Sequence, residues 1–237
     1  MKKFLLSILL ALSLISLPVF SDQHPQSTAK YYLKEVEMMA PTVLVIAPGH
    51  GLGTGVILHQ DGHNYAILTG KHVVDELKIV FVEIAGKRYP AKVIKESYDR
   101  DLALLYVKAP YKQFHTARLC EKPGERFDEV WSVGAGLGSP IFPTKGVLSN
   151  RDWHFTKNPD MLVPEIQWYQ HSAAIAPGNS GGPLYTKQNG HYCVVGINLR
   201  GYIGTDVNGF PLPVSQFNFA LSLEEINKFF EAKYGWK

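Results

Sequence analysis

The chain has 237 residues, of which 46% are hydrophobic and 19% are charged. This composition is typical of a globular protein of one or two domains and excludes a disordered chain or a coiled coil. The formal net charge of +3 falls to +1 when Lys2 and Lys3 are left out. A nearly neutral protein gives no bulk electrostatic case for binding nucleic acid or an acidic membrane.

The N-terminal segment is typical of an export signal. Lys2 and Lys3 precede an apolar stretch over residues 4–17, and Pro18 then ends any helix. The apolar stretch is shorter than the roughly 20 residues of a membrane anchor, although an uncleaved anchor is the alternative. We expect cleavage after Ser21, with no anchor left, and a periplasmic or secreted protein. Residues 1–21 are then the signal peptide and residues 22–31 a polar leader.

The mature chain is predicted to be mostly short β-strands. Residues 31–39 have one or two turns of helical pattern, which Pro41 limits, and residues 223–232 return to helical spacing. Between them, Gly, Pro, Asn and Asp separate strand-like runs, which favours a sandwich or barrels over parallel units. These runs cover residues 42–46, 55–69 (a hairpin), 80–84, 89–94, 102–107, 130–133, 144–148, 165–171, 183–185, 192–198 and 216–220.

Cys120 and Cys193 are the two cysteines of the chain. In an oxidising compartment an even count permits one disulfide, and two buried free thiols are the alternative. The sequence does not decide whether the two side chains meet, so both possibilities remain open.

The candidate nucleophile lies in the segment 173–184. Ser180 stands among Gly178, Gly181 and Gly182, after an apolar run and before a strand. Gly178 can adopt a backbone conformation that turns its N–H towards a ligand, and Ser180 contributes a second N–H. Two convergent N–H groups beside a hydroxyl form an oxyanion hole around a nucleophile. An ordinary glycine-rich turn is the alternative interpretation.

A serine nucleophile needs a base, and the base needs an orienting acid. Among nine histidines, His72 is the favoured base because it directly follows the strand-like run 66–69. His59 and His63 flank a hairpin turn, but with no third ligand nearby we expect no metal site there.

Asp101 is the favoured acid. It immediately precedes the apolar run 102–107, so its carboxylate is expected at the mouth of a buried strand, where it can accept a histidine N–H. Asp99 is the competitor, but it lies one step further from that run and next to Arg100, so we expect it to be solvated.

Three motifs, TGKHVV, DRDLALLYV and APGNSGGPL, resemble those of the trypsin-like serine peptidases, in the order His, Asp, Ser. More narrowly, they are similar to the protease domain of the bacterial HtrA/DegP group, as are the flanking pieces GTGVI, VGAGLG and FNFAL. The resemblance implies an all-β fold of two antiparallel six-stranded β-barrels with a C-terminal helix. We expect one protease domain over residues 32–237, with the boundary between its halves near residues 115–130.

The resemblance also implies the role of each site residue. His72 would be the general base and acid, Asp101 would hold its tautomer, and Ser180 would attack the scissile carbonyl of a protein or peptide substrate. The N–H groups of Gly178 and Ser180 would form the oxyanion hole, and no cofactor is implied. Further residues implied to contact the substrate are Ala174, Ile175 and Asn198.

Departures from the family pattern refine the expectation. Ala174 stands where trypsin has an aspartate, so we expect a preference for small or apolar side chains rather than Lys or Arg. Asn179 replaces an aspartate of the digestive enzymes, which disfavours their activation by N-terminal cleavage. Since the chain ends at Lys237, we expect no PDZ domain. An oligomer is possible but not indicated, and Lys71, beside the histidine, has no explanation from the sequence.

Two other functions were weighed against a peptidase. A catalytically inactive or partner-activated module that binds peptides or proteins is the main alternative, although no triad residue is missing. An esterase is disfavoured because the motif is not a strand-turn-helix elbow and the order is not Ser, Asp, His. Residues 150–164 could influence specificity. Four aromatic residues of the second half are expected to pack the barrel rather than line a substrate groove: Trp153, Phe155, Trp168 and Tyr169.

Overall fold

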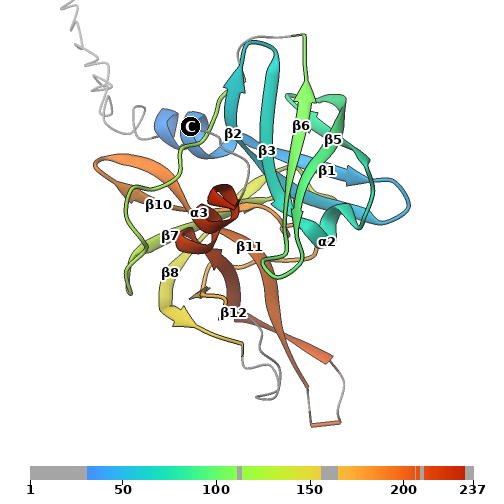
Figure 1. Ribbon diagram of the computed structural model, residues 1–237. Helices are drawn as coiled ribbons and strands as arrows, with labels where there is room; N and C mark the ends of the chain where they lie inside the picture. The colour runs from blue at the N-terminus through green and yellow to red at the C-terminus, as the bar shows by residue number, and fades with distance from the viewer. Residues whose placement is uncertain (1–30, 111–113, 156–164, 206, 209–210, 233–237) are drawn as a thin grey trace, which may run out of the picture.

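The computed structural model describes residues 31–110, 114–155, 165–205, 207–208 and 211–232. Its strands form two closed six-stranded antiparallel barrels, which confirms the predicted fold class (Figure 1). The first barrel has the strand order β1-β2-β3-β6-β5-β4 and the second β10-β11-β12-β9-β8-β7. The predicted signal peptide and nearly all of the polar leader lie outside the described residues. Within the described ranges, no helix is long and apolar enough to cross a membrane.

The first barrel is built from six strands whose inward side chains are small or branched apolar residues. Its interior cluster includes Val43, Val45, Ile57, Ile67 and Leu105, all with no exposed surface. The alternation of these residues with outward ones follows from the pleat of a strand. The strands are β1 (Thr42–Ala47), β2 (Gly51–Asp61), β3 (Asn64–Gly70), β4 (Ile79–Ile84), β5 (Lys87–Ser97) and β6 (Leu102–Lys108).

The second barrel contains the two longest neighbouring strands of its sheet, β11 and β12. These two extend beyond the barrel as a hairpin at the lower edge of Figure 1. The strands are β7 (Glu129–Gly134), β8 (Phe142–Trp153), β9 (Trp168–His171), β10 (Pro183–Gln188), β11 (His191–Thr205) and β12 (Pro211–Ser222). The sequence pattern predicted only the buried halves of β11 and β12, because the projecting halves lack the alternation that burial imposes.

Short helical elements complete the part of the chain that the structure describes. The predicted N-terminal helix contains a π-helical turn, η1 (Glu35–Met39), and the predicted C-terminal helix is α3 (Leu223–Glu231). Two single-turn elements that were not predicted, α2 (Lys71–Val74) and η2 (Gly136–Gly138), lie at the junction of the barrels. They are too short to give a periodic sequence signal.

Helix α3 fastens the second barrel to the first. The side chain of Ser222 caps its N-terminus by accepting from the Glu225 N–H, and Ile226 and Phe229 are buried beneath it. The Glu225 carboxylate is 1% exposed and accepts from Arg100 Nε of the first barrel at 2.8 Å. In Figure 1, α3 lies between the two barrels, above the projecting end of the β11–β12 hairpin.

A disulfide joins Cys120 to Cys193, so of the two possibilities left open by the sequence the structure has the bonded pair. Cys120 belongs to the segment that connects β6 to β7, and its N–H donates to the Val194 carbonyl of β11 at 2.9 Å. The disulfide therefore links the connection between the barrels to strand β11 of the second barrel.

Candidate active site

The candidate base and acid meet because β3 and β6 are neighbours. Gly70, the last residue of β3, pairs with Leu102, the first of β6, so the residues just beyond each strand face one another. His72 Nδ1 lies 2.7 Å from Asp101 Oδ2, and the His72 backbone N–H donates to Oδ1 at 2.9 Å. Because a carboxylate only accepts, Nδ1 carries the proton and Nε2 is left as an acceptor.

Asp101 is held from its backbone as well as its side chain. Its φ of +54° lies in the left-handed region that Asp tolerates better than most residues. Its carbonyl accepts from the Lys71 N–H at 2.9 Å. Asp99, the competing candidate, is exposed and is not the residue that meets His72.

The turn before Ser180 aims two N–H groups in one direction. The Asn179 N–H donates to the Ala176 carbonyl at 2.9 Å, and Gly178 has a φ of +102°, which together describe a type II turn. The Pro177 carbonyl accepts from the Leu137 N–H at 2.6 Å. Since C=O and N–H of one trans peptide point in opposite directions, the Gly178 N–H points away from Leu137.

Neither the Gly178 N–H nor the Ser180 N–H has a hydrogen-bond acceptor in the part of the chain that the structure describes. Two neighbouring donors beside a serine hydroxyl can stabilise an oxyanion. Gly178 is required at its position, because a Cβ there would lie 2.4 Å from the Ala135 carbonyl oxygen as well as at an unfavourable φ.

Thr54 of β2 holds this turn from the first barrel. Its N–H donates to the Ser180 carbonyl at 2.8 Å, and its hydroxyl donates to the Gly178 carbonyl at 2.6 Å. The same hydroxyl accepts from the Ala135 N–H at 3.0 Å. Thr54 has no exposed surface, so these bonds are shielded from water.

The serine turn packs directly against the histidine segment. A Cβ on Gly181 would lie 2.6 Å from the Gly70 backbone nitrogen, and a Cβ on Gly70 would lie 3.2 Å from His72 Cε1. These two glycines therefore allow the serine turn of the second barrel to lie directly against the end of β3, next to His72.

Residues 53–197 match the trypsin-like peptidase domain family. The chain belongs to that family.

Curated relatives of this trypsin-like peptidase include the magnetosome formation protease MamE of Paramagnetospirillum magneticum, 36% identical over 70% of this chain and 22% of the relative. A probable periplasmic serine endoprotease of DegP-like type from Marinomonas sp. is 35% identical over 64% of this chain and 30% of the relative. The chain thus spans less than a third of the length of these relatives.

Solved structures share the fold of this trypsin-like peptidase. The serine endoprotease from Yersinia pestis matches with a TM-score of 0.65 and 22% identity, over 85% of this chain and 65% of that chain. The Rv3671c protease in its inactive form matches with a TM-score of 0.66 and 21% identity, over 88% of this chain and 95% of that one.

The candidate substrate contacts of the trypsin-like peptidase separate into two groups. Ala174 is exposed, and Ile175 Cδ1 lies 4.0 Å from the point where a Gly201 Cβ would be, so Ile175 and Gly201 are neighbours. Asn198 is fully buried instead. Its amide donates to oxygens inside the second barrel, those of Ser132, Gly182 and Pro183. Its side chain therefore supports the serine turn rather than facing a substrate.

Lys71, which the sequence left unexplained, has two partners in the structure. Its ammonium lies 4.1 Å from the centroid of the Tyr98 ring and 3.9 Å from Glu76 Oε1. The side chain thus packs on Tyr98 beside Glu76, contacts that the sequence did not reveal.

No group of three or more His, Cys, Asp or Glu side chains is placed to hold a metal ion within the described ranges. His63 donates from Nδ1 to the Ala109 carbonyl at 3.0 Å instead.

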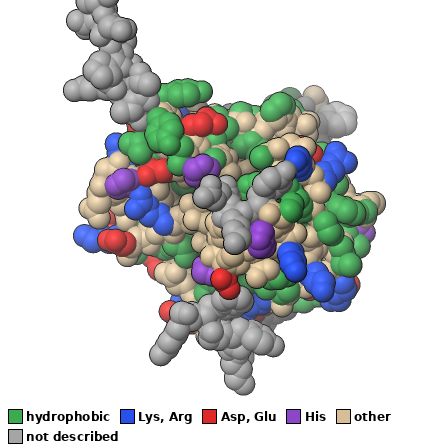
Figure 2. Space-filling view, turned by 90° about the horizontal axis from the view of Figure 1, so that it is seen from above, with side chains coloured by type: hydrophobic (Ala, Val, Ile, Leu, Met, Phe, Trp, Pro, Cys, Tyr) green, Lys and Arg blue, Asp and Glu red, His purple; other side chains and the backbone are tan. Residues whose placement is uncertain are grey.

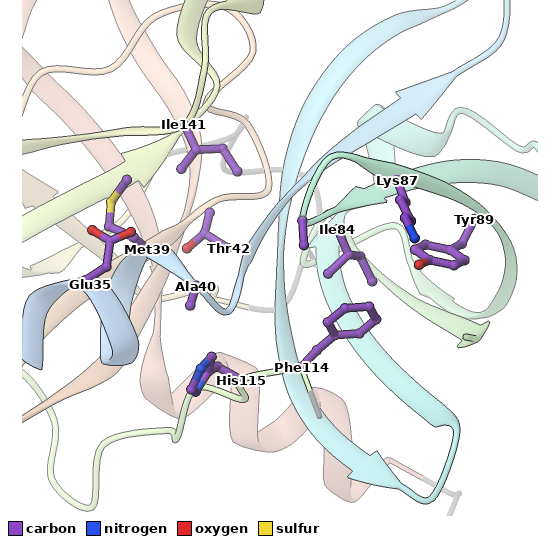
Figure 3. Close-up of a pocket in the computed structure, with 11 residues that line it drawn as sticks. Glu35, Met39, Ala40, Thr42, Ile84, Lys87, Tyr89, Phe114, His115 and Ile141 are labelled. Atoms are coloured by element: carbon purple, nitrogen blue, oxygen red, sulfur yellow. The ribbon is translucent and has the colours of Figure 1, made fainter. Parts of the chain in front are cut away.

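A cavity of about 860 Å³ opens between η1 and the β4–β5 turn. Figure 3 shows Ile84, Tyr89 and Phe114 on one wall and Glu35 and Met39 on the other. His72, Asp101 and Ser180 do not line this cavity. The candidate site is therefore placed by the geometry of these three residues and not by the largest volume described.

Proposed function

We propose that this protein is an exported serine endopeptidase that uses His72, Asp101 and Ser180 through an acyl-enzyme intermediate. The observation that carries the proposal is the orientation of the serine turn. The Gly178 and Ser180 N–H groups are free to donate, and the Pro177 carbonyl is bonded on the far side. The His72–Asp101 hydrogen bond of 2.7 Å supports the same activity.

The chemistry follows from these positions. His72 Nε2 removes the proton of Ser180 Oγ as the oxygen attacks the scissile carbonyl carbon, and the carbonyl oxygen becomes an anion. The N–H groups of Gly178 and Ser180 stabilise that anion, and Asp101 stabilises the imidazolium. His72 then gives its proton to the leaving amine, and a water molecule hydrolyses the acyl-enzyme by the reverse steps. The mechanism uses no cofactor.

The residues beside the serine turn favour a small or apolar residue on the acyl side of the cleaved bond. Ile175 is apolar and lies next to Gly201, and Ala174 provides no charge to attract Lys or Arg. Asn218 Oδ1 is also close, 3.8 Å from the point where a Gly201 Cβ would be.

Export is supported by the N-terminal pattern of Lys2, Lys3 and an apolar stretch, and by DegP-like relatives named as probable periplasmic endoproteases. The substrates are then proteins or peptides outside the cytoplasm. The face shown in Figure 2 mixes Lys, Arg, Asp and Glu among hydrophobic side chains, which fits a polypeptide better than a uniformly charged polymer.

Hydrolysis of unfolded casein by the purified mature protein tests the proposal, with Ser180→Ala as the matched control. Release of peptides by the wild type but not by the variant supports it. Retention of intact casein by a folded wild-type protein that binds casein would instead favour a peptide-binding module.

A further inference from the structure

Arg200 lies between two residues that border the candidate site. Leu199 Cδ2 is 3.0 Å from the point where a Gly70 Cβ would be, one residue before the histidine segment. Ile175 Cδ1, from the segment before the serine turn, lies 4.0 Å from the point where a Gly201 Cβ would be. Strand β11 therefore runs from the neighbourhood of His72 to that of Ile175, with Arg200 between them.

One edge of β11 is open along this stretch. Its pairing with β10 ends at Ile197, whereas its pairing with β12 on the other side continues to Thr205. Among the described strands, none pairs with this edge beyond Asn198, whose carbonyl accepts from the Gly181 N–H at 2.7 Å. An open edge that begins beside the serine turn is a template for an extended polypeptide.

The Arg200 side chain is held over aromatic rings. Its guanidinium carbon lies 5.0 Å from the centroid of the Trp168 ring and 5.4 Å from that of Phe155. Phe155 in turn packs edge-to-face on Trp168 and Phe219 with centroids 5.4 and 4.8 Å apart. The aromatic residues expected to pack the barrel do so, and they also form a platform that fixes the direction of an exposed cation.

Four other arginines make ion pairs with a glutamate: Arg88, Arg100, Arg118 and Arg151. Arg200 differs from them, because its partners are two aromatic rings, and among the residues that the structure describes its side chain has no ion pair or hydrogen bond. A guanidinium stacked on rings keeps its in-plane N–H groups available, and their fork matches the two oxygens of a carboxylate.

We infer that Arg200 binds an acidic side chain of the substrate, on the acyl side of the cleaved bond. The inference rests on the proposed endopeptidase activity and names a class of substrate for the same site: a polypeptide with Asp or Glu a few residues upstream of a small residue. Since side chains of an extended chain alternate in direction, the acidic residue is recognised at alternate positions only.

Quenched fluorescent peptides with Ala before the cleaved bond test this, each made with Glu or Gln at one of the four upstream positions. At alternate upstream positions, we expect the wild type to cleave the Glu peptide with a kcat/KM about fivefold higher than the Gln peptide. This ratio corresponds to a good exposed ion pair. In Arg200→Gln the ratio falls to about one while cleavage of the Gln peptides is retained. Arg200→Lys keeps part of the ratio, because the charge remains and the fork is lost.

Arg126, an exposed arginine of the segment between the barrels, provides the matched control, and Arg126→Gln must leave the ratio unchanged. Equal cleavage of Glu and Gln peptides by the wild type, or the same ratio at all four positions, would overturn the inference and leave the endopeptidase intact. Absence of cleavage of every peptide and of casein would instead count against the proposed function itself.

Discussion

The hydroxyl of Thr54 donates to the carbonyl of Gly178 at 2.6 Å, across the junction of the two barrels. The Thr54 N–H donates to the Ser180 carbonyl in the same way. A single residue of the first barrel therefore holds the peptides that follow Gly178 and Ser180. The turn that carries both oxyanion donors is thus supported from the first barrel.

Replacing Thr54 by valine removes the hydroxyl and preserves the shape of the side chain. The Gly178 carbonyl and the Ala135 N–H then lose their partner, so the peptide after Gly178 loses its anchor and the turn that carries both donors is held less firmly. We expect kcat on a peptide substrate to fall about tenfold or more with a much smaller change in KM. Thr54→Ser restores the hydroxyl and should recover most of kcat. A proportional loss in both variants would show that Thr54 acts only through packing.

Replacing Asp101 by asparagine tests the tautomer argument. The amide can donate to Nδ1, which would place the imidazole proton on Nε2 and leave no base for Ser180. We expect kcat to fall by about 10⁴ near neutral pH, whereas Asp99→Asn should retain nearly full activity. Steady-state kinetics of the two variants compare them directly, and equal losses would contradict the assignment of Asp101.

The ion pair between Arg100 and Glu225 gives a prediction for stability. Glu225 is 1% exposed and also accepts from Lys228 Nζ at 2.7 Å, so Glu225→Gln leaves two cations short of a partner. We expect the free energy of unfolding to drop by about 3 kcal/mol, measured by urea denaturation. The exposed Glu231, at the end of the same helix, is the control, and Glu231→Gln should change it by less than about 0.5 kcal/mol.

His171 predicts how stability depends on pH. Burial lowers the pKa of this fully buried imidazole from 6.5 to about 4. Between these values the unfolded chain binds more protons than the folded one, so the free energy of unfolding rises with pH. The stability that neutral His171 contributes is therefore lost as the pH falls from 6.5 towards 4.

The contribution of His171 is about 2 kcal/mol between pH 7 and pH 5. Urea titration at each pH measures the free energy of unfolding. His171→Gln should reduce the difference between its values at pH 7 and pH 5 by about 2 kcal/mol, whatever the effect of the substitution at pH 7. An unchanged difference would contradict a neutral buried imidazole.

The disulfide between Cys120 and Cys193 closes a sequence separation of 73 residues. Replacing both cysteines by serine should lower the free energy of unfolding by about 2–4 kcal/mol, because the unfolded chain regains freedom. Urea denaturation of the double variant and of the wild type measures this. Similar midpoints for the two proteins, or no effect of a reductant on the wild type, would contradict it.

Much of the fold was predictable from the sequence because local patterns carry it. Alternation in residues 42–46 and helical spacing in residues 223–232 reflect burial on one face, and the structure has a strand and a helix there. The segment containing Gly178 and Ser180 was recognisable because a turn with positive φ requires glycine.

Other features depend on contacts between distant segments, and no local pattern records them. Thr54 lies in the GTGVI segment, which resembles the family but does not show which partner the threonine bonds. Arg200 lies two residues beyond the predicted strand 192–198, in a strand that continues as half of a projecting hairpin, so its place beside the site came only from the topology. Asn198 was expected to contact substrate, yet a bulge at this point turns its side chain into the barrel.

Covalent labelling of the mature protein by a fluorophosphonate, read by intact mass and peptide mapping, tests the central claim most directly. The account predicts one adduct, located on Ser180, that is absent from Ser180→Ala and from the denatured wild type. A folded wild-type protein that acquires no adduct, or an adduct that persists in Ser180→Ala, would contradict an assembled triad and oxyanion hole.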